Sequence, residues 1–302
     1  MSVTKILKKF ISLITNSNRT PTEKLRTLKE LILIKFEHFK RLRIVIKPKP
    51  PRFSGWGMTS NHFTPWDRNS SDEIGLEFSE VNSRLLAGLN AENIVYGGGY
   101  EIDGYENLLK ERLWRHYIIY WTSKFAVKNT HAEKVNVVEA GVWYGMSTTY
   151  AISALQNTVG QSSNFEVFLY DAWEGMKEEN LTHSEKYRTG EYSYLSLEQS
   201  KSNLRDFQNN CRFIKGHIPD VFVENPGPTE LSWLHIDLRS SLPTLRTLEH
   251  FAPKLLPGGV ILFDDYSHSI YKVIKIAVDE YCRQLKGLLF PLPTGQAIFF
   301  KH

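Results

Sequence analysis

The 302-residue sequence predicts an α/β fold built on a mostly parallel sheet that is flanked by helices. Two observations lead to this prediction. The apolar run Val137–Ala140 ends in a glycine loop, and Thr148–Leu155 can continue from the loop as a helix. Strand, glycine turn and helix in this order form the first half of a βαβ unit. Further apolar runs alternate with helical segments, which is typical of a parallel sheet.

The first 52 residues predict a basic helical extension. Apolar residues recur at helical spacing between the lysines of Lys5–Ile14. A second helix begins at Thr20–Glu23, which offers an N-cap, a proline in the first turn and the acid of a capping box, and it can run to about Ile46. Residues 53–100 are rich in Pro, Gly, Ser, Asn and aromatic residues, so we expect an irregular connecting segment before the main domain at 101–302.

Charge is divided unevenly along the chain. The formal net charge is +4, but residues 1–52 hold 14 of the 37 Lys and Arg and only 3 of the 33 acidic residues. The remainder is acidic and therefore a poor binder of nucleic acid. The basic helices within residues 1–46 can lie on an anionic membrane face, or they can pack on the main domain or on a second subunit of a homo-oligomer.

Cysteine content and apolar runs predict the compartment. Cys211 and Cys282 are the only cysteines, too few for a disulfide framework or a thiolate metal site, and this favours a reducing location. The apolar run Phe10–Ile14 is too short for a signal peptide or a membrane span. We therefore expect a cytoplasmic protein, with any membrane contact peripheral and at the inner face.

The main domain is expected to alternate helices and strands. Tyr105–Val127 has the broad apolar face of a helix that precedes the first strand. Further strands are expected at 165–170, 211–215, 233–237, 260–263 and 296–301, with helices at 197–207, 243–254 and 269–285. The polar segment 177–194 is a candidate lid. Aspartates follow three of these strands, and ligands of parallel α/β sheets bind at such strand ends.

The glycine loop separates two classes of cofactor. A dinucleotide loop reads G-x-G-x-x-G and offers amides to a pyrophosphate, whereas this loop reads Gly141-x-x-x-Gly145-x-Ser147 beside Glu139. A carboxylate there would repel a pyrophosphate by ~1 kcal/mol or more, but it suits the ammonium and sulfonium of S-adenosylmethionine, so the methyl donor is preferred over NAD.

Asp171 can bind ribose hydroxyls in either class of cofactor, or it can cap the next helix. The predicted cofactor-binding residues are Glu139, Gly141, Val142, Trp143, Tyr144, Gly145, Ser147, Asp171, Ala172, Trp173, Gly216 and Asp237.

Three aspartates at neighbouring strand ends predict a metal site. Asp237, Asp264 and Asp265 suit a hard divalent cation, and like charges so close together would otherwise repel. The alternative is that Asp264 and Asp265 cap the next helix while Asp237 touches the cofactor.

Seven short motifs carry a resemblance to a known family. They are Glu139–Gly145, Asp171–Met176, Ser196–Gln199, Phe213–Gly216, Leu255–Val260, Asp264–Tyr266 and Thr294–Gln296. In this order they resemble the macrocin/mycinamicin/novobiocin sugar O-methyltransferases over roughly residues 95–302. The resemblance implies a Rossmann-like methyltransferase fold with a seven-stranded sheet, S-adenosylmethionine, and Mg²⁺ held by Asp237, Asp264 and Asp265. It also implies methylation of a sugar hydroxyl on a glycan precursor or a glycosylated natural product.

The chain departs from the family's pattern at Arg239. Family members usually have Asp-x-Asp here, with the second aspartate as general base, but this chain has Asp237–Leu238–Arg239. Arginine stays protonated, so the base is expected to be His268 or His217, unless the metal alone lowers the pKa of the hydroxyl. A guanidinium at this position can bind an anionic acceptor, or it can pair with a nearby acid at the surface. A metal-independent small-molecule methyltransferase and a cofactor-binding scaffold without turnover are the alternative functions.

Removal of residues 1–46 should leave the affinity for S-adenosylmethionine within about threefold and should lower binding to anionic vesicles, an attraction that salt screens. The reason is that every predicted site residue lies in the main domain. Calorimetric titration and vesicle co-sedimentation measure the two effects. Loss of cofactor binding on truncation would show instead that the extension belongs to the folded core.

Overall fold

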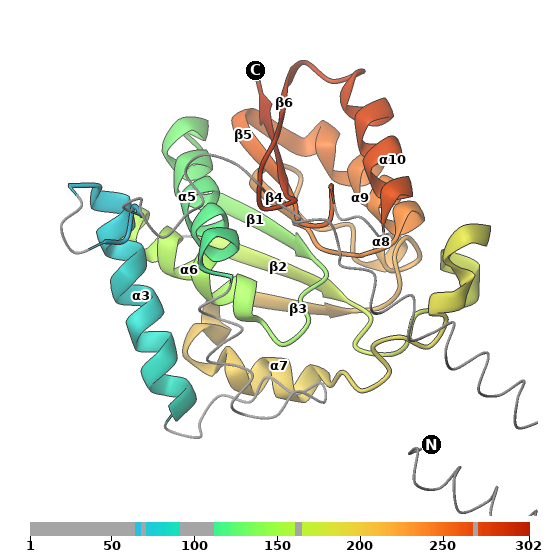
Figure 1. Ribbon diagram of the computed structural model, residues 1–302, viewed down its shortest axis with the longest axis horizontal. Helices are drawn as coiled ribbons and strands as arrows, with labels where there is room; N and C mark the ends of the chain where they lie inside the picture. Colours follow the sequence, from blue (N-terminus) through green and yellow to red (C-terminus); the bar gives the residue numbers. More distant parts are fainter. Residues whose placement is uncertain (1–63, 68–70, 91–111, 161–164, 268–270) are drawn as a thin grey trace, which may run out of the picture. The chain divides into compact units, whose positions relative to one another are not determined.

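The computed structural model describes residues 64–67, 71–90, 112–160, 165–267 and 271–302 (Figure 1). The predicted N-terminal extension lies outside these ranges, and so does the candidate base His268.

A seven-stranded sheet organises the main domain. Its first five strands are parallel neighbours in the order β3-β2-β1-β4-β5, followed by β7 and β6. Strand β7 pairs antiparallel with β5, and β6 pairs antiparallel with β7. The bounds are β1 Val135–Ala140, β2 Phe165–Asp171, β3 Cys211–Lys215, β4 Leu231–Ile236, β5 Leu255–Phe263, β6 Gly287–Pro291 and β7 Ala297–Lys301. The predicted mostly parallel, Rossmann-like sheet is confirmed.

Strand side chains alternate between two apolar layers, as the period of two in a strand requires. Val137 and Val167 belong to one layer, which α3 (Glu73–Asn90), α5 (Leu113–Thr130) and α6 (Met146–Val159) cover. Val138 and Phe168 belong to the other, covered by α8 (Val221–Glu224), α9 (Ser241–Phe251) and α10 (Lys272–Cys282). Figure 1 shows the helices on the two faces of the sheet. Because both faces are buried, the loops at the strand ends are left free to form a site.

The structure corrects the expectation that residues 53–100 are irregular, because α3 (Glu73–Asn90) is an 18-residue helix. Phe78, Val81 and Leu85 follow helical spacing and are buried in the core. Glu77 of α3 forms a 2.6 Å ion pair with the buried Lys124 of α5. This spacing was the available signal, and the prolines, glycines and asparagines on either side of it obscured the helix.

Other boundaries differ from the sequence expectation by a few residues. The helix expected at 197–207 is α7 (Leu197–Asn203) followed by a 3₁₀ turn, Arg205–Asn210. A further 3₁₀ turn, Ala252–Lys254, follows α9. Strand β6 was not predicted, because its apolar run Leu288–Phe290 is short and is bounded by glycine and proline. Proline is tolerated there because β6 is the edge of the sheet.

Among the residues that the structure places, no helix has the length and apolar character needed to span a bilayer.

Candidate active site

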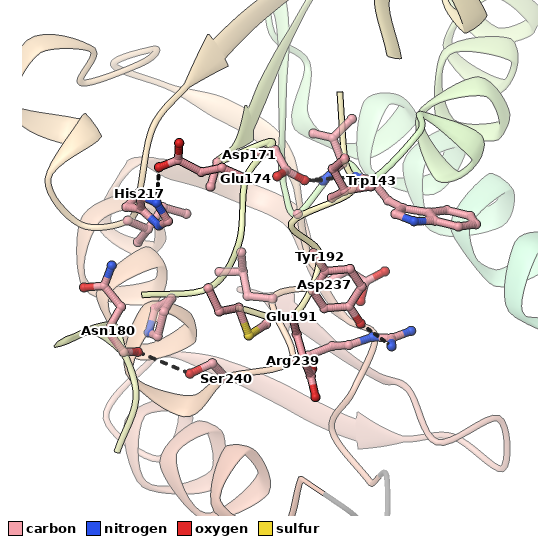
Figure 2. Close-up of a pocket in the computed structure, with 18 of the residues that line it drawn as sticks. Trp143, Asp171, Glu174, Asn180, Glu191, Tyr192, His217, Asp237, Arg239 and Ser240 are labelled. Atoms are coloured by element: carbon pink, nitrogen blue, oxygen red, sulfur yellow. Dashed lines mark hydrogen bonds and ion pairs between the residues drawn. The ribbon is translucent and has the colours of Figure 1, made fainter. Parts of the chain in front are cut away.

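A cavity of about 510 Å³ opens at the carboxyl ends of the parallel strands (Figure 2). Residues that follow β1, β2, β3 and β4 line it. Strand order reverses between β1 and β4, and open α/β sheets bind ligands at such a reversal. The volume lies in the range of small-molecule sites.

Eight of the twelve residues predicted to bind the cofactor line this cavity. They are Gly141, Val142, Trp143, Ser147, Asp171, Ala172, Gly216 and Asp237. The predicted catalytic residues His217 and Arg239 line it as well. Four predicted cofactor residues do not line the cavity: Glu139, Tyr144, Gly145 and Trp173. The predicted metal ligands Asp264 and Asp265 do not line it either.

The glycine loop is fixed by backbone geometry and by one carboxylate. Gly141 has φ +90°, and a Cβ at this position would lie 2.0 Å from the carbonyl oxygen of Asp237, so only glycine fits. Asp171 Oδ2 accepts hydrogen bonds from the backbone N–H groups of Val142 (2.8 Å) and Trp143 (2.9 Å), and Oδ1 accepts one from Trp173 (2.8 Å). Burial raises the pKa of Asp171, although these N–H groups act to lower it. Asp171 therefore shapes the loop while remaining part of the cavity wall.

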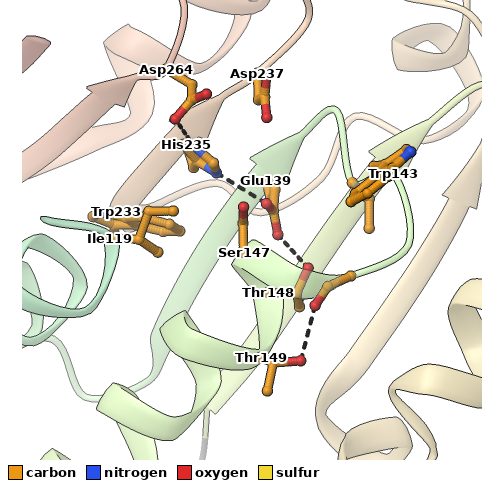
Figure 3. A network of polar contacts seen from close by, with 12 residues as sticks. Ile119, Glu139, Trp143, Ser147, Thr148, Thr149, Trp233, His235, Asp237 and Asp264 are labelled. Atoms are coloured by element: carbon orange, nitrogen blue, oxygen red, sulfur yellow. Dashed lines mark hydrogen bonds and ion pairs between the residues drawn. The ribbon is translucent and has the colours of Figure 1, made fainter. Parts of the chain in front are cut away.

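Glu139 lies beneath the loop in a buried polar chain (Figure 3). Its Oε2 accepts a hydrogen bond from the Thr148 hydroxyl, and its Oε1 lies 3.0 Å from His235 Nδ1. His235 Nε2 is 3.9 Å from Asp264 Oδ1, too far for a hydrogen bond but close enough for electrostatic attraction. Burial lowers the pKa of His235, but Asp264 and Glu139 outweigh burial and raise it. Glu139 thus has a supporting position beneath the loop, and its contact with the cofactor stays a prediction.

The three predicted metal ligands come together, but an arginine lies between two of them. One oxygen from each of Asp237, Asp264 and Asp265 lies within 4.8 Å of the others. Arg115 of α5 donates from Nε to both oxygens of Asp264 (2.8 and 2.9 Å) and from Nη2 to Asp237 Oδ2 (2.8 Å). Burial raises the pKa of Asp264, but Arg115 and His235 outweigh it and hold the pKa below its usual range.

Arg239 has an unusual backbone and faces the cavity. Its φ is +51°, in the left-handed region that non-glycine residues rarely adopt. Its backbone N–H donates to Asp265 Oδ2 (3.1 Å), and its side chain donates to the Tyr192 hydroxyl. Burial lowers the pKa of Arg239, but Asp237 and Tyr192 outweigh burial and raise the pKa above its usual value. The guanidinium therefore stays charged and cannot act as a base.

His217 lies away from the aspartate cluster. Its Nε2 is 2.5 Å from Glu174 Oε1 (Figure 2). It follows β3, and β2 and β1 separate β3 from β4, whose end carries Asp237. Three strand spacings of ~4.8 Å amount to roughly 14 Å. This distance disfavours the predicted use of His217 as the base for a hydroxyl bound near Asp237.

The polar segment 177–194 forms one wall of the cavity and is anchored at its base. It contains the 3₁₀ turns Glu178–Asn180 and His183–Arg188. The buried Glu185 accepts hydrogen bonds from the backbone N–H and the hydroxyl of Ser241 at the start of α9, both at 2.9 Å. Arg188, also buried, donates to the carbonyl of Arg239 and forms a 2.7 Å ion pair with Glu191. These contacts attach the segment to α9 and to the residues after β4, and its use as a lid stays a prediction.

Three residues of the site were not predicted from the sequence. Arg112 and Tyr192 line the cavity, and Arg115 both lines it and binds the aspartates. The available signal was the presence of two arginines three residues apart where α5 begins, beside its apolar residues. Tyr192 carried no such signal, because tyrosines are scattered throughout its segment.

Comparison with known proteins agrees with the geometry. Residues 138–266 match a family model described as a methyltransferase domain. The 8-demethyl-8-(2,3-dimethoxy-alpha-L-rhamnosyl)-tetracenomycin-C 4'-O-methyltransferase of Streptomyces olivaceus is 28% identical over 193 residues, which cover 59% of this chain and 71% of that protein. The structure of the O-methyltransferase NovP superposes with a TM-score of 0.60 at 20% identity, over 76% of this chain and 99% of that one. The calicheamicin methyltransferase CalS11 gives 0.46 at 17% identity, over 82% and 98%.

The sheet order and the matched domain define a class I, S-adenosylmethionine-dependent methyltransferase. The matched residues contain the glycine loop, Asp171 and the aspartate cluster. The chain is an O-methyltransferase, and the matched domain and the tetracenomycin relative support the resemblance to the macrocin/mycinamicin/novobiocin sugar O-methyltransferases seen in its motifs.

Replacement of Gly141 by alanine should weaken S-adenosylmethionine binding by at least about tenfold, because backbone atoms 2.0 Å from the new Cβ cannot move aside as a side chain can. Calorimetric titration measures the affinity. Gly295→Ala is the matched control, since Gly295 has a similar φ of +91° but open space around it. Equal affinities for the two variants would show that the loop does not position the cofactor.

Replacement of Glu139 by alanine should lower the free energy of unfolding by about 3 to 5 kcal/mol, because it removes the nearer of the two charged partners of the buried His235. Chemical denaturation measures this loss. Glu198→Ala should change stability by less than about 1 kcal/mol, since Glu198 belongs to an exposed ion pair. If Glu139→Ala has unchanged stability but no longer binds the cofactor, Glu139 contacts the methyl donor directly.

Proposed function

We propose that the protein transfers a methyl group from S-adenosylmethionine to a sugar hydroxyl of a glycan precursor or a glycosylated natural product. The observation that carries this proposal is the convergence of Gly141, Asp171 and Asp237 on one cavity at the strand-order reversal. The tetracenomycin relative supports the acceptor class, because its name describes methylation of a product that bears a rhamnosyl group.

The cofactor would lie along the ends of β1 and β2. The residues that would hold it are Gly141 and Ser147 of the loop, Asp171 and Ala172 after β2, and Gly216 after β3. Asp171 uses three of the roughly four acceptor positions of a carboxylate on backbone N–H groups, which leaves one on Oδ1 for a ribose hydroxyl. When bound, S-adenosylmethionine supplies an electrophilic methyl group on a positively charged sulfur.

Asp237 would accept the proton of the acceptor hydroxyl. Its Oδ2 is held by Arg115, whereas Oδ1 accepts no hydrogen bond from the residues that the structure describes. The side chain lines the cavity, which a general base must do to reach the hydroxyl. Asp237 would thus have the role of general base that the sequence predicts for His217 or His268.

Two arginines would favour an anionic acceptor, such as a uronic acid or a phosphate-linked sugar. Arg112 and Arg239 both line the cavity, and neither side chain forms an ion pair within the described ranges. Burial lowers the pKa of Arg112, and the charges of Arg115 and Arg239 lower it as well. A carboxylate or phosphate placed between the guanidinium groups of Arg112 and Arg239 would stabilise both charges.

Magnesium does not fit the arrangement observed, although the family resemblance implies it. The guanidinium of Arg115 lies between Asp237 and Asp264, where a bridging ion would have to bind at about 2.1 Å from each oxygen. The proposed chemistry therefore uses no metal. A scaffold that binds the cofactor without turnover is the competing function, and a methyl-transfer assay on mixed sugar acceptors separates the two.

We further propose a cytoplasmic homo-oligomer in which residues 1–46 contact the inner face of the membrane. The composition of residues 1–52 and the two cysteines support this placement. Leu288 and Phe290 on the edge strand β6 are 57% and 53% exposed, which suits a contact between subunits.

Replacement of Arg239 by alanine should raise the KM for a uronic acid acceptor by about tenfold or more, since a charge-assisted contact is worth about 1.5 to 3 kcal/mol. The KM for S-adenosylmethionine should change little. Steady-state assays on paired neutral and acidic sugars measure both values. Arg246→Ala is the control, because Arg246 is an arginine of α9 paired with Glu249 and does not line the cavity. Faster turnover of neutral sugars by Arg239→Asp, with acidic sugars unaffected, would contradict the anionic acceptor.

A further inference from the structure

Arg115 is positioned as a bridging cation inside the aspartate cluster. Its three guanidinium nitrogens all face polar partners: Nε donates to both oxygens of Asp264, Nη2 donates to Asp237, and Nη1 lies 3.4 Å from the Ser147 hydroxyl. The two carboxylates come from the ends of β4 and β5, and Arg115 comes from α5, so the contact connects three elements. A divalent ion bridging the same two carboxylates would need the space that the guanidinium fills.

Asp264 has little capacity left for a metal ion. Besides the two contacts with Arg115, its Oδ1 accepts a hydrogen bond from Gln296 Nε2 at 3.0 Å. Gln296 Nε2 also lies 3.5 Å from the backbone carbonyl of Arg115, and Gln296 is buried, so the three residues hold one another in place. A metal bound by Asp264 would have to displace hydrogen bonds that are already satisfied in a dry environment.

Three arginines offset the aspartates without a metal. Asp237, Asp264 and Asp265 supply three carboxyl groups, and Arg112, Arg115 and Arg239 supply three guanidinium groups close enough to interact with them electrostatically. Arginine is always charged in proteins, so these three positive charges do not vary with pH. A divalent ion added to the cluster would introduce two uncompensated positive charges into a largely buried region, which is unfavourable.

We propose that the guanidinium of Arg115 replaces the divalent cation of this site, so that the enzyme binds no metal in its aspartate cluster and methylates its acceptor without one. Arg115 balances the carboxylates and fixes Asp237 through Oδ2, while Oδ1 stays free toward the cavity. Arg115 is in this respect a positioning residue for Asp237. The inference deepens the proposed function, but its central claim about metal binding does not depend on the acceptor.

Arg239 fits the same explanation. In the family pattern, a second aspartate stands where this chain has Arg239, and a metal neutralises the cluster. With Arg115 in place of a metal, a further aspartate at position 239 would add a negative charge that no metal and no further arginine compensates. An arginine at this position adds a positive charge instead. The two arginines therefore form one consistent change from a metal-based site to a guanidinium-based site.

Direct measurement of metal binding tests the inference on the full-length protein. Electron paramagnetic resonance with Mn²⁺ reports free and bound ion without any acceptor or methyl donor. The wild-type protein should bind no stoichiometric Mn²⁺, and Arg115→Ala should bind at least about tenfold more tightly, because three carboxylates within 4.8 Å lose their bridging cation. Asp264→Asn in the Arg115→Ala background should abolish the new site. Arg112→Ala is the matched control and should bind no Mn²⁺, since Arg112 lines the cavity without an ion pair to the aspartates.

The activity assay gives a second readout. Turnover of the wild-type enzyme should stay within about twofold after treatment with EDTA and after addition of Mg²⁺. Stoichiometric Mn²⁺ binding by the wild type that Asp237→Asn removes, or loss of turnover in EDTA that Mg²⁺ restores, would overturn the inference. If Arg115→Ala fails to fold, the wild-type measurements still decide. Absence of turnover on every sugar acceptor would count against the proposed function, while the Mn²⁺ result would still test the metal-free cluster.

Discussion

A buried chain of charged and polar groups beneath the cavity is the interaction on which the rest of the site depends. From α6 to the end of β4 it runs through Thr148, Glu139, His235, Asp264, Arg115 and Asp237. Glu139 and His235 are 1% and 0% exposed, so water cannot solvate their charges. Each group must then be compensated by its neighbour, and removal of one leaves the next uncompensated.

This chain also determines what the cavity can offer to a ligand. Because Glu139 and Asp264 are used within the chain, the carboxylates that remain on the cavity wall are Asp171, Asp237, Glu174 and Glu191. Two of these are also committed to protein groups, since Glu174 lies against His217 and Glu191 pairs with Arg188. Asp171 faces the nucleoside side of the proposed site and Asp237 the acceptor side. The polar chain therefore divides the aspartates between structural support and contact with ligands.

Backbone geometry supplies the second constraint. The close approach of Gly141 to the carbonyl of Asp237 fixes the distance between the ends of β1 and β4, and the three N–H groups bound by Asp171 fix the loop against β2. The segment 177–194 is attached to α9 through Glu185, and this attachment brings Tyr192 to Arg239. Loop, strand ends and wall are thus held independently of any ligand, which is the preorganisation that a transfer reaction needs.

The sequence by itself determined the fold class, the glycine loop and the acids at the strand ends. These features follow from local patterns: an apolar run of strand length, a glycine at a position that needs positive φ, and aspartates directly after strands. Eight of twelve predicted cofactor residues line the cavity for this reason. The helix α3 and the strand β6 were missed because neighbouring prolines, glycines and exposed positions weakened the same local patterns.

Only the tertiary structure decided which partner each acid has. Arg115 lies 122 residues before Asp237 and 149 before Asp264 in the sequence, and no local pattern connects them. Likewise Glu139 has the strand-end position of a ligand-binding acid, yet the packing of β4 beside β1 places His235 against it. The identity of a charged residue determines which groups it can bind. In the folded chain, a buried charge must be compensated, so the nearest opposite charge becomes its partner wherever that partner lies in the sequence.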